Sequence, residues 1–267
     1  MRKQFNMQEA KTKTQVDMAY REYQQFMQTS NMPSYVFQYI KQNGTTIAEE
    51  RYENNEYNLI IADTLCTTYK ENAKSILFHE FTHIFDEEEL VKTYGFSHDD
   101  RNTPYVYKEI HAEQIRTLYL LGCKTVNDIE NIDKDRVTFS FKKKSYNIYD
   151  YIMEYKKELL ENIKIIELAR TTGYKIAMQE FSNILTRIFC YIASSSVYLK
   201  YCDNDAYGDI DIQPVYDYYN YGLNTFLKEC VKNPIGYHTK ELVEAMGKWR
   251  MLVFVHFGKD MELIDFK

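Results

Sequence analysis

Apolar side chains recur at helical spacing near the start of the chain and then give way to extended, β-branched runs. The helical pattern covers residues from about Thr14 to Gln28, and Asn31 to Pro33 interrupt it, which predicts a helix that ends before Asn31. Its apolar members are Val16, Ala19, Tyr20, Tyr23, Phe26 and Met27. Beyond "KQNGT", the segments "TIAEERY" and "YNLIIADTL" flank the turn-prone residues "ENNE", which predicts a hairpin or two neighbouring strands.

Two helices that follow have clear start and stop signals. Asn72 is a favourable N-cap and Gly95 a favourable stop, so the first of these helices should occupy the residues between them. Thr103 resembles an N-cap with Pro104 at the first helical position, and Gly122 should end the second helix.

The rest of the chain reads mainly as helices, without an internal repeat or a low-complexity linker. The expected helices are Tyr149 to Ala169, Tyr174 to Tyr201, Val215 to Val231 and Thr239 to about Phe257. The change from mixed to all-helical patterning falls near residues 124–145. We therefore expect an N-terminal domain at residues 1–123 and a helical domain of unknown role at residues 124–267.

Composition and charge narrow the functional classes. With 267 residues, 45% of them hydrophobic and 27% charged, the chain can bury a sizeable core as a soluble protein. The net charge of −6, with Lys and Arg spread along the chain, argues against nucleic acid as the main partner. The most apolar windows contain Arg187 or are too short to span a bilayer, so no membrane partner is expected.

Cysteine usage points to a reducing compartment. The cysteines are odd in number and mostly far apart, and no CxxC pair is present, so neither a thiolate zinc site nor a disulfide framework is indicated. They are Cys66, Cys123, Cys190, Cys202 and Cys230. The N-terminus starts basic but lacks the apolar run of a secretory signal. We expect a cytoplasmic protein; the sequence does not indicate its oligomeric state.

Residues 79–83 read His-Glu-Phe-Thr-His and lie in the middle of the first punctuated helix. Positions i and i+4 share one helix face, so His79 and His83 can converge on one Zn²⁺ at about 2.0–2.1 Å each. Glu80 can reach a water on that metal as general base and then carry the proton to the leaving group. Zinc would lower the pKa of this water from about 15.7 to about 7. Apolar neighbours would bury the motif, which favours a metal site over two unrelated histidines on one helix.

A hydrolytic zinc needs a third protein ligand and one open position. Asp86 lies about 10 Å along the helix axis from His79, too far to complete the same site. It could instead hydrogen-bond to a ligand histidine or be a surface carboxylate. The next helix carries Glu109 and Glu113 one turn apart on one face, whereas His111 points roughly away from both. The residues alone leave Glu109 and Glu113 open as the third ligand.

The arrangement of strands, motif helix and glutamate helix, over about residues 45–121, resembles the gluzincin branch of the zincin metallopeptidases. Glu109-Ile-His-Ala112 matches the family's glutamate followed three residues later by alanine, and Glu113 lacks this small residue. The resemblance therefore implies Glu109 as ligand and Glu113 as the alternative. We expect His111 to hydrogen-bond to a ligand or to lie at the surface rather than to bind the metal. The metzincin continuation is absent, because Asp86 and Glu89 take the positions of its glycine and last histidine.

The compact layout also resembles the ImmA/IrrE-type metallopeptidases often carried by phages and mobile elements, although the chain lacks a DNA-binding helical module and has a long helical tail. This resemblance implies cleavage of a protein or peptide inside a bacterial cell. In zincins the strand before the motif helix forms an edge of the cleft and pairs with the substrate, which implies that role for "YNLIIADTL". The family also implies a Tyr or His that stabilises the oxyanion, and Tyr105, Tyr107 and His98 are candidates.

These observations predict an α+β fold: a zincin-like core with a small, mainly antiparallel sheet, followed by a mainly helical C-terminal region. The expected activity is zinc-dependent peptide hydrolysis, with zinc held by His79, His83 and Glu109 and water activated by Glu80. The alternative is a regulatory or binding protein that contains zinc on the same fold but has no catalytic role.

Overall fold

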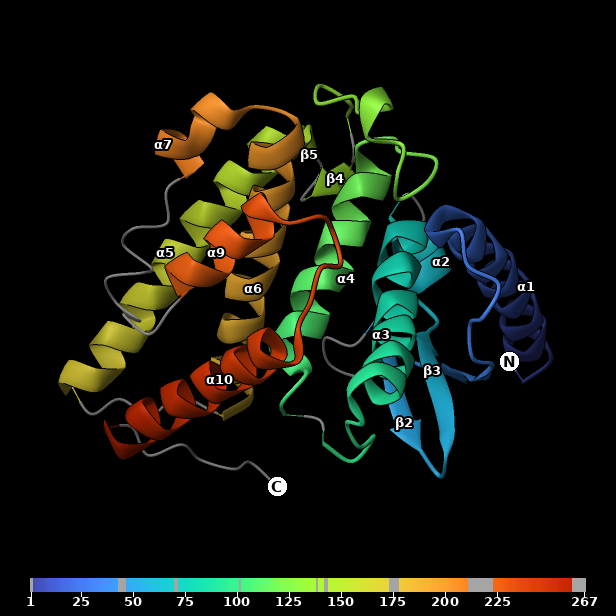
Figure 1. The fold of residues 1–267 in the computed structure, drawn as a ribbon. Helices are drawn as coiled ribbons and strands as arrows, with labels where there is room; N and C mark the ends of the chain where they lie inside the picture. Colours follow the sequence, from blue (N-terminus) through green and yellow to red (C-terminus); the bar gives the residue numbers. More distant parts are fainter. Residues whose placement is uncertain are drawn as a thin grey trace. The chain divides into compact units, whose positions relative to one another are not determined.

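The computed structural model describes residues 2–42, 47–69, 72–100, 102–137, 139–141, 144–172, 178–210 and 223–260 (Figure 1). The chain divides into two compact units, each made of two segments. The first comprises Met1–Asp99 and Ile115–Ser145, and the second comprises Asp100–Gln114 and Tyr146–Lys267. Helix α4 (Tyr105–Leu120) is continuous and contributes its first part to the second unit and its last part to the first.

The first unit combines helices with a small sheet. Its elements are α1 (Arg2–Met27), β1 (Tyr35–Ile40), β2 (Ala48–Glu53), β3 (Glu56–Ala62), α2 (Leu65–Thr68), α3 (Ala73–Tyr94), the end of α4, the short helix η1 (Ile129–Asn131) and β4 (Phe139–Phe141), which pairs with β5 (Lys144–Tyr146). Helix α3 packs against α1 and against β2 (Figure 1). The expected α+β class is thereby confirmed.

The three-stranded sheet has the order β1-β3-β2. Strands β2 and β3 form the expected antiparallel hairpin, closed by Asn54 and Asn55 with φ angles of 55° and 63°. Two consecutive positive φ angles define a type I′ turn, which matches the twist of the flanking strands and favours Asn. Strand β1 is parallel to β3, so the sheet is mixed and the expectation of a mainly antiparallel sheet is wrong.

The expectation that "YNLIIADTL" forms an edge strand is also wrong. Its strand β3 is paired on both sides, and β1 and β2 form the edges of this sheet. The physical reason is visible in the sequence, because residues 57–62 are mostly buried on both faces and form a nearly continuous apolar run. Such a run is typical of a strand covered on both faces, whereas the alternating, charged β2 is typical of an edge.

The core of the first unit is aromatic and joins α1 to α3. Tyr23 is fully buried, and its ring lies 5.4 Å from that of Phe78 and 5.6 Å from that of Phe81, between centroids. Phe26 contacts Phe78 at 5.4 Å. Edge-to-face contacts at these distances contribute beyond the area they bury. They fix the motif helix against α1 along one face.

The second unit is helical. Its elements are the start of α4, α5 (Ile148–Thr172), α6 (Met178–Tyr201), η2 (Asn204–Ala206), α7 (Tyr207–Ile210), α9 (Leu223–Lys232) and α10 (Lys240–Asp260). Helix α6 packs against α5 and α9 (Figure 1). The core is built around Trp249, whose ring meets those of Phe189 at 5.6 Å and Phe226 at 6.4 Å. The C-terminal region expected to be mainly helical is therefore mainly helical in its described part, which also contains loops and the short strands β4 and β5.

The helix predictions hold to different degrees. The helix between Asn72 and Gly95 occupies Ala73–Tyr94 as expected, and Gly95 ends it in the left-handed conformation with φ 70°. Asn72 occupies the N-cap position as expected, but its side chain makes no cap hydrogen bond. Residues 174–177 and 215–222 of the expected C-terminal helices lie outside the described residues.

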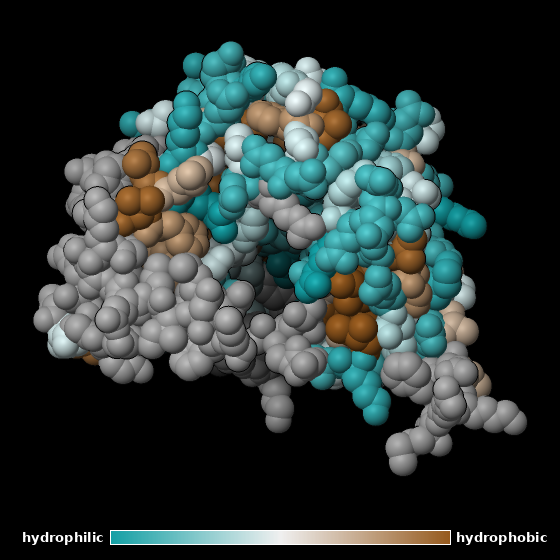
Figure 2. All heavy atoms as spheres, turned by 90° about the horizontal axis from the view of Figure 1, so that it is seen from below, coloured by the Kyte–Doolittle hydropathy of each residue, from teal (hydrophilic) through white to brown (hydrophobic). Residues whose placement is uncertain are grey.

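Figure 2 shows a face on which hydrophilic residues dominate the described part, with small, separate hydrophobic areas. Scattered apolar residues of this kind are ordinary on a protein surface. A search of the described helices finds none with the length and apolar character that crossing a bilayer would require.

Candidate metal centre

The motif helix places both histidines on one face. His79 and His83 are one turn apart on α3, and their rings lie 4.7 Å apart between centroids and nearly perpendicular, at 88°. Phe81 and Thr82, by contrast, contact α1: the ring of Phe81 lies 5.6 Å from that of Tyr23, and Thr82 accepts a hydrogen bond from Tyr23 Oη at 3.0 Å. Thr82 in turn donates to the Phe78 carbonyl at 2.8 Å. The apolar half of the motif thus anchors the helix against α1 and fixes the rotation of the histidine half.

Glu80 is held by the backbone of the edge strand β2. Its Oε2 accepts a hydrogen bond from the Glu50 N–H at 3.0 Å. The hairpin geometry explains this contact. In a two-residue turn the closing pair, Glu53 and Glu56, is hydrogen-bonded, so Arg51 and Glu49 bond to β3 and the N–H of Glu50 faces away from it. The carboxylate proposed as general base is therefore oriented by a main-chain donor on a sheet edge.

Glu109 completes the donor set that the sequence predicts. One nitrogen from each of His79 and His83 and one carboxylate oxygen of Glu109 all lie within 4.8 Å of one another. Ligand atoms at about 2.0–2.2 Å from one zinc are at most about 4.4 Å apart, so small side-chain adjustments suffice to bind one ion. His83 is 8% exposed and Glu109 is 9% exposed. Two imidazoles and one carboxylate fit zinc, and they leave a coordination position for a water or substrate.

Glu113, the alternative ligand, is engaged elsewhere in the second unit. It is 1% exposed, and its Oε1 accepts a hydrogen bond from Ser194 Oγ on α6 at 3.3 Å. The next residue, Gln114, donates from Nε2 to Ser196 Oγ at 3.0 Å. The group of residues that could hold a metal ion contains Glu109 and does not contain Glu113. Glu113 belongs instead to a buried polar layer between α4 and α6.

His111 points toward the loop between α9 and α10. Its side chain is 4% exposed, and its ring lies 5.8 Å from that of Tyr107. A Cβ on Gly236, which has φ +76°, would come within 2.8 Å of His111 Nε2, so the loop approaches the imidazole as closely as only glycine permits. His111 is not one of the three residues that could hold a metal ion.

Asp86 is buried rather than at the surface. Its side chain is 2% exposed on α3, one turn beyond Thr82. Burial, and to a lesser extent the charge of Asp86, raise the pKa of Tyr23 well above its usual value. The alternative of a surface carboxylate is therefore wrong. Asp86 is absent from the group that could hold a metal, consistent with its distance along the helix.

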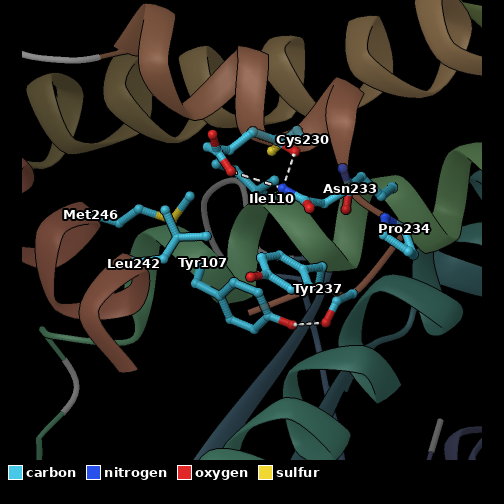
Figure 3. A pocket seen from close by; sticks show the side chains of 11 residues that line it. Tyr107, Ile110, Cys230, Asn233, Pro234, Tyr237, Leu242 and Met246 are labelled. Carbon is cyan, nitrogen blue, oxygen red and sulfur yellow. Dashed lines mark hydrogen bonds between the residues drawn. The ribbon is translucent and has the colours of Figure 1, made fainter. Parts of the chain in front are cut away.

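The three candidates for stabilising an oxyanion each have a structural partner. Tyr107 Oη donates to the Gly236 carbonyl at 3.0 Å, on the side of α4 that faces the α9–α10 loop (Figure 3). Tyr105 Oη lies 2.7 Å from Thr186 Oγ1 on α6. His98 stacks on Tyr52 at 3.9 Å, and its Nδ1 lies 3.1 Å from Glu87 Oε1. These contacts give each residue a structural role and leave the oxyanion role unassigned.

The cavity beside Tyr107 is too small for a peptide. Its lining includes Tyr107, Ile110, Cys230, Asn233 and Tyr237 (Figure 3), and its volume is about 20 Å³. That volume holds roughly one water molecule. Burial raises the pKa of the Cys230 thiol to about 12, which leaves it protonated and poorly nucleophilic. A cavity of this size, with an unreactive thiol in its lining, does not have the properties of a substrate site.

Sequence reasoning missed the contacts that orient the motif. The hydrogen bond from the Glu50 backbone to Glu80 depends on the register of a hairpin, which no residue type encodes directly. The serines at 194 and 196 were a readable signal, because three consecutive serines inside an apolar helix pattern need buried partners. Those partners are Glu113 and Gln114.

Comparison of the chain with protein-family models, with curated proteins and with solved structures finds no match.

Proposed function

We propose that this chain hydrolyses peptide bonds with the help of a zinc ion held by His79, His83 and Glu109. The observation that carries this proposal is the convergence of these three donors beside a glutamate that follows the first histidine. When bound, zinc supplies a Lewis acid that lowers the pKa of a water to about 7 and polarises the carbonyl under attack. The remaining chemistry belongs to the side chains of this protein.

Glu80 moves the proton. Its carboxylate accepts a proton from the attacking water while the water oxygen bonds to the carbonyl carbon of the substrate. Glu80 then returns this proton to the amide nitrogen as the C–N bond breaks, which yields a carboxylic acid and an amine, and the acid gives its proton to the amine. The Glu50 N–H holds Oε2 at 3.0 Å, so the carboxylate is positioned before the substrate arrives.

The substrate class is a protein or peptide segment that can become extended. Strand β2 is an edge of the sheet, and the N–H of its residue Glu50 faces away from β3 toward Glu80. An extended segment that adds to this edge would bring a backbone carbonyl next to the general base. In this proposal the strand that pairs with the substrate is β2, and not β3 as expected from the sequence.

A Glu80→Gln variant tests the hydrolytic role. Glutamine keeps the size of the side chain but cannot accept the proton, so peptide cleavage should fall by at least about 100-fold while zinc content stays the same. A mixture of synthetic peptides, analysed by mass spectrometry, detects cleavage without knowledge of the natural substrate. Glu53→Gln is the matched control, because Glu53 is an exposed glutamate of the same hairpin.

The outcomes separate hydrolysis from a zinc-containing binding protein. Cleavage by the zinc-loaded wild type that disappears in Glu80→Gln and persists in Glu53→Gln supports hydrolysis. Equal cleavage by wild type and Glu80→Gln would show that Glu80 is not the general base. Zinc binding without cleavage of any peptide, together with cellular function that survives Glu80→Gln, would establish the binding or regulatory alternative.

A further inference from the structure

Helices α1, α2 and α3 of the first unit line an open pocket of about 190 Å³. Helix α1 contributes side chains between Gln15 and Glu22, α2 contributes Cys66, and α3 contributes side chains between Ala73 and Leu77. All of these residues belong to one compact unit, and none belongs to the group that could hold a metal. The α1–α2–α3 pocket is therefore a candidate site separate from the metal centre.

The interior of this pocket is apolar and shaped by small side chains. Ala19 and Leu77 are 3% and 2% exposed, and Ala73 is the first residue of α3. Because alanine is short, the helices leave between them a space that longer side chains would fill.

Two sulfur-containing side chains complete the apolar part of the lining. They are Met18, which is 57% exposed, and Cys66. Burial raises the pKa of the Cys66 thiol, so the thiol is uncharged at neutral pH. Sulfur makes favourable contacts with aromatic rings, and the flexible methionine side chain adapts to a bound group. This part of the lining therefore favours a flat aromatic ring.

The volume of the pocket limits the size of a ligand. An apolar cavity of about 150 Å³ is large enough to bind benzene, whereas pockets for drug-sized ligands measure about 300–1,000 Å³. The pocket of about 190 Å³ has room for one ring and a small substituent. A peptide segment or a helix of another protein is too large for it.

Lys74 and Glu22 give the pocket one polar edge. Lys74 Nζ donates to Glu22 Oε2 at 2.5 Å, and both side chains belong to the lining. This pair has no net charge, so it does not offset the cost of removing a charged ligand from water. A neutral hydroxyl group, by contrast, can accept a hydrogen bond from the ammonium group and donate one to the carboxylate.

We propose that the α1–α2–α3 pocket binds a simple phenol, a neutral single-ring compound whose hydroxyl group bonds to Lys74 and Glu22. The ring would fill the apolar space between α1 and α3. These two helices already pack through Tyr23 and Phe78, so the ligand adds to the contacts that hold the motif helix. Binding requires neither zinc nor hydrolysis.

Calorimetric titration of the full chain with phenol tests the site. Phenol should bind one-to-one with a Kd of about 1 mM or lower, the range expected for a ligand of about seven non-hydrogen atoms. Benzoate and benzylammonium should bind at least about 10-fold more weakly, because their charges would lose water beside a neutral ion pair. Toluene, which matches phenol in size but has no hydroxyl group, serves to separate the contribution of the ring from that of the hydroxyl.

A pocket-filling variant and a chemical footprint locate the bound phenol. Ala73→Phe should abolish binding, and Ala10→Phe is the matched control, because Ala10 is an exposed residue of α1 outside the lining. In the wild type, phenol at ten times its Kd should slow alkylation of Cys66 about 10-fold by mass action and leave that of Cys202 unchanged. The footprint carries the test if Ala73→Phe does not fold.

The double variant Glu22→Met/Lys74→Met tests the role of the hydroxyl group. It preserves the net charge and removes an ion pair whose side chains are 43% and 41% exposed, so the protein should remain folded. Phenol should bind about 10-fold more weakly to this variant, as expected for the loss of hydrogen bonds to charged groups. Toluene should bind no more weakly than to the wild type.

The outcomes decide both the site and the class of ligand. Phenol binding that protects Cys66, disappears in Ala73→Phe and weakens in the double variant supports the proposal. Absence of saturable phenol binding, or binding that leaves Cys66 unprotected, would overturn it, as would equal losses in Ala73→Phe and Ala10→Phe. Unchanged phenol affinity in the double variant, or tighter binding of benzoate than of phenol, would overturn the assignment of a neutral hydroxyl compound.

Discussion

Tyr23 connects α1 to the motif helix through one buried hydroxyl. Its Oη donates to Thr82 Oγ1 at 3.0 Å, and Thr82 lies directly before the second histidine. In Tyr23→Phe the ring still fills the core, but Thr82 loses its donor. The free energy of unfolding should fall by about 1 kcal/mol, as for other buried neutral hydrogen bonds. Denaturant titration followed by circular dichroism measures this difference.

Tyr237→Phe is the control for that substitution. It also removes a phenolic hydroxyl, but from a side chain that is 45% exposed, so the free energy of unfolding should change by less than about 0.5 kcal/mol. An equal loss in both variants would show that the Tyr23–Thr82 contact does not hold the motif helix in place.

At the same scale, the sequence revealed the chemistry of individual residues better than their environment. The spacing of His79, Glu80 and His83 predicts a metal site directly, because two imidazoles one turn apart have few other common purposes. The orientation of Glu80 gave no such signal, because its hydrogen-bond donor is the main-chain N–H of Glu50 on β2, which depends on the register of the hairpin.

Among the elements, the loop between α9 and α10 depends on one glycine. Gly236 has φ +76°, and a Cβ there would lie 2.8 Å from His111 Nε2. Gly236→Ala should therefore cost both backbone strain and displacement of a buried imidazole, together about 2–4 kcal/mol of stability. Thermal unfolding of the variant, compared with wild type, gives the value.

Gly95→Ala separates the two contributions. Gly95 ends α3 with φ +70°, but a Cβ there meets nothing within 4 Å. Only the backbone cost applies, about 1–2 kcal/mol. If Gly236→Ala were no more destabilising than Gly95→Ala, the loop would not press against His111 as described.

Elements with two independent signals were predicted accurately, and those with one were not. Helix α3 matches its expected bounds because both ends carry turn-forming residues, although only Gly95 acts through its conformation. Helix α1 begins at Arg2, well before the expected Thr14. The prediction started too late because the first turns of this helix carry few apolar residues at regular spacing. The order of the strands was not predictable, because β1 pairs with β3 through a parallel contact that no local pattern specifies.

At the scale of the whole molecule, the cysteines report on the packing of both units. The described residues contain no disulfide, and burial raises the pKa of Cys123 to about 11 and that of Cys230 to about 12. At pH 8 a thiol with pKa 11 is about one part in a thousand thiolate, compared with about one quarter for an unperturbed thiol. Both should therefore react with iodoacetamide at least about 100-fold more slowly in the folded than in the denatured protein.

The pH dependence of alkylation tests whether the raised pKa values of Cys123 and Cys230 cause their slow reaction. Raising the pH increases the thiolate fraction, so Cys123 should become reactive before Cys230, provided that the protein stays folded. Peptide mapping by mass spectrometry assigns each site. Rapid labelling of Cys230 at pH 8 in the folded protein would contradict the raised pKa of its thiol. The division into domains at residues 1–123 and 124–267 remains a prediction, since the two compact units are each assembled from two segments.

The most direct measurement of the central claim is zinc content per chain, by elemental analysis, for the wild type, Glu109→Ala and Glu113→Ala purified in parallel. We expect about one zinc in the wild type, a sharp decrease in Glu109→Ala, and retention in Glu113→Ala, whose carboxylate bonds to Ser194 instead. Retention in Glu109→Ala with loss in Glu113→Ala would move the third ligand to Glu113. Little zinc in the wild type, even after reconstitution, would contradict the metal site and with it the hydrolytic function.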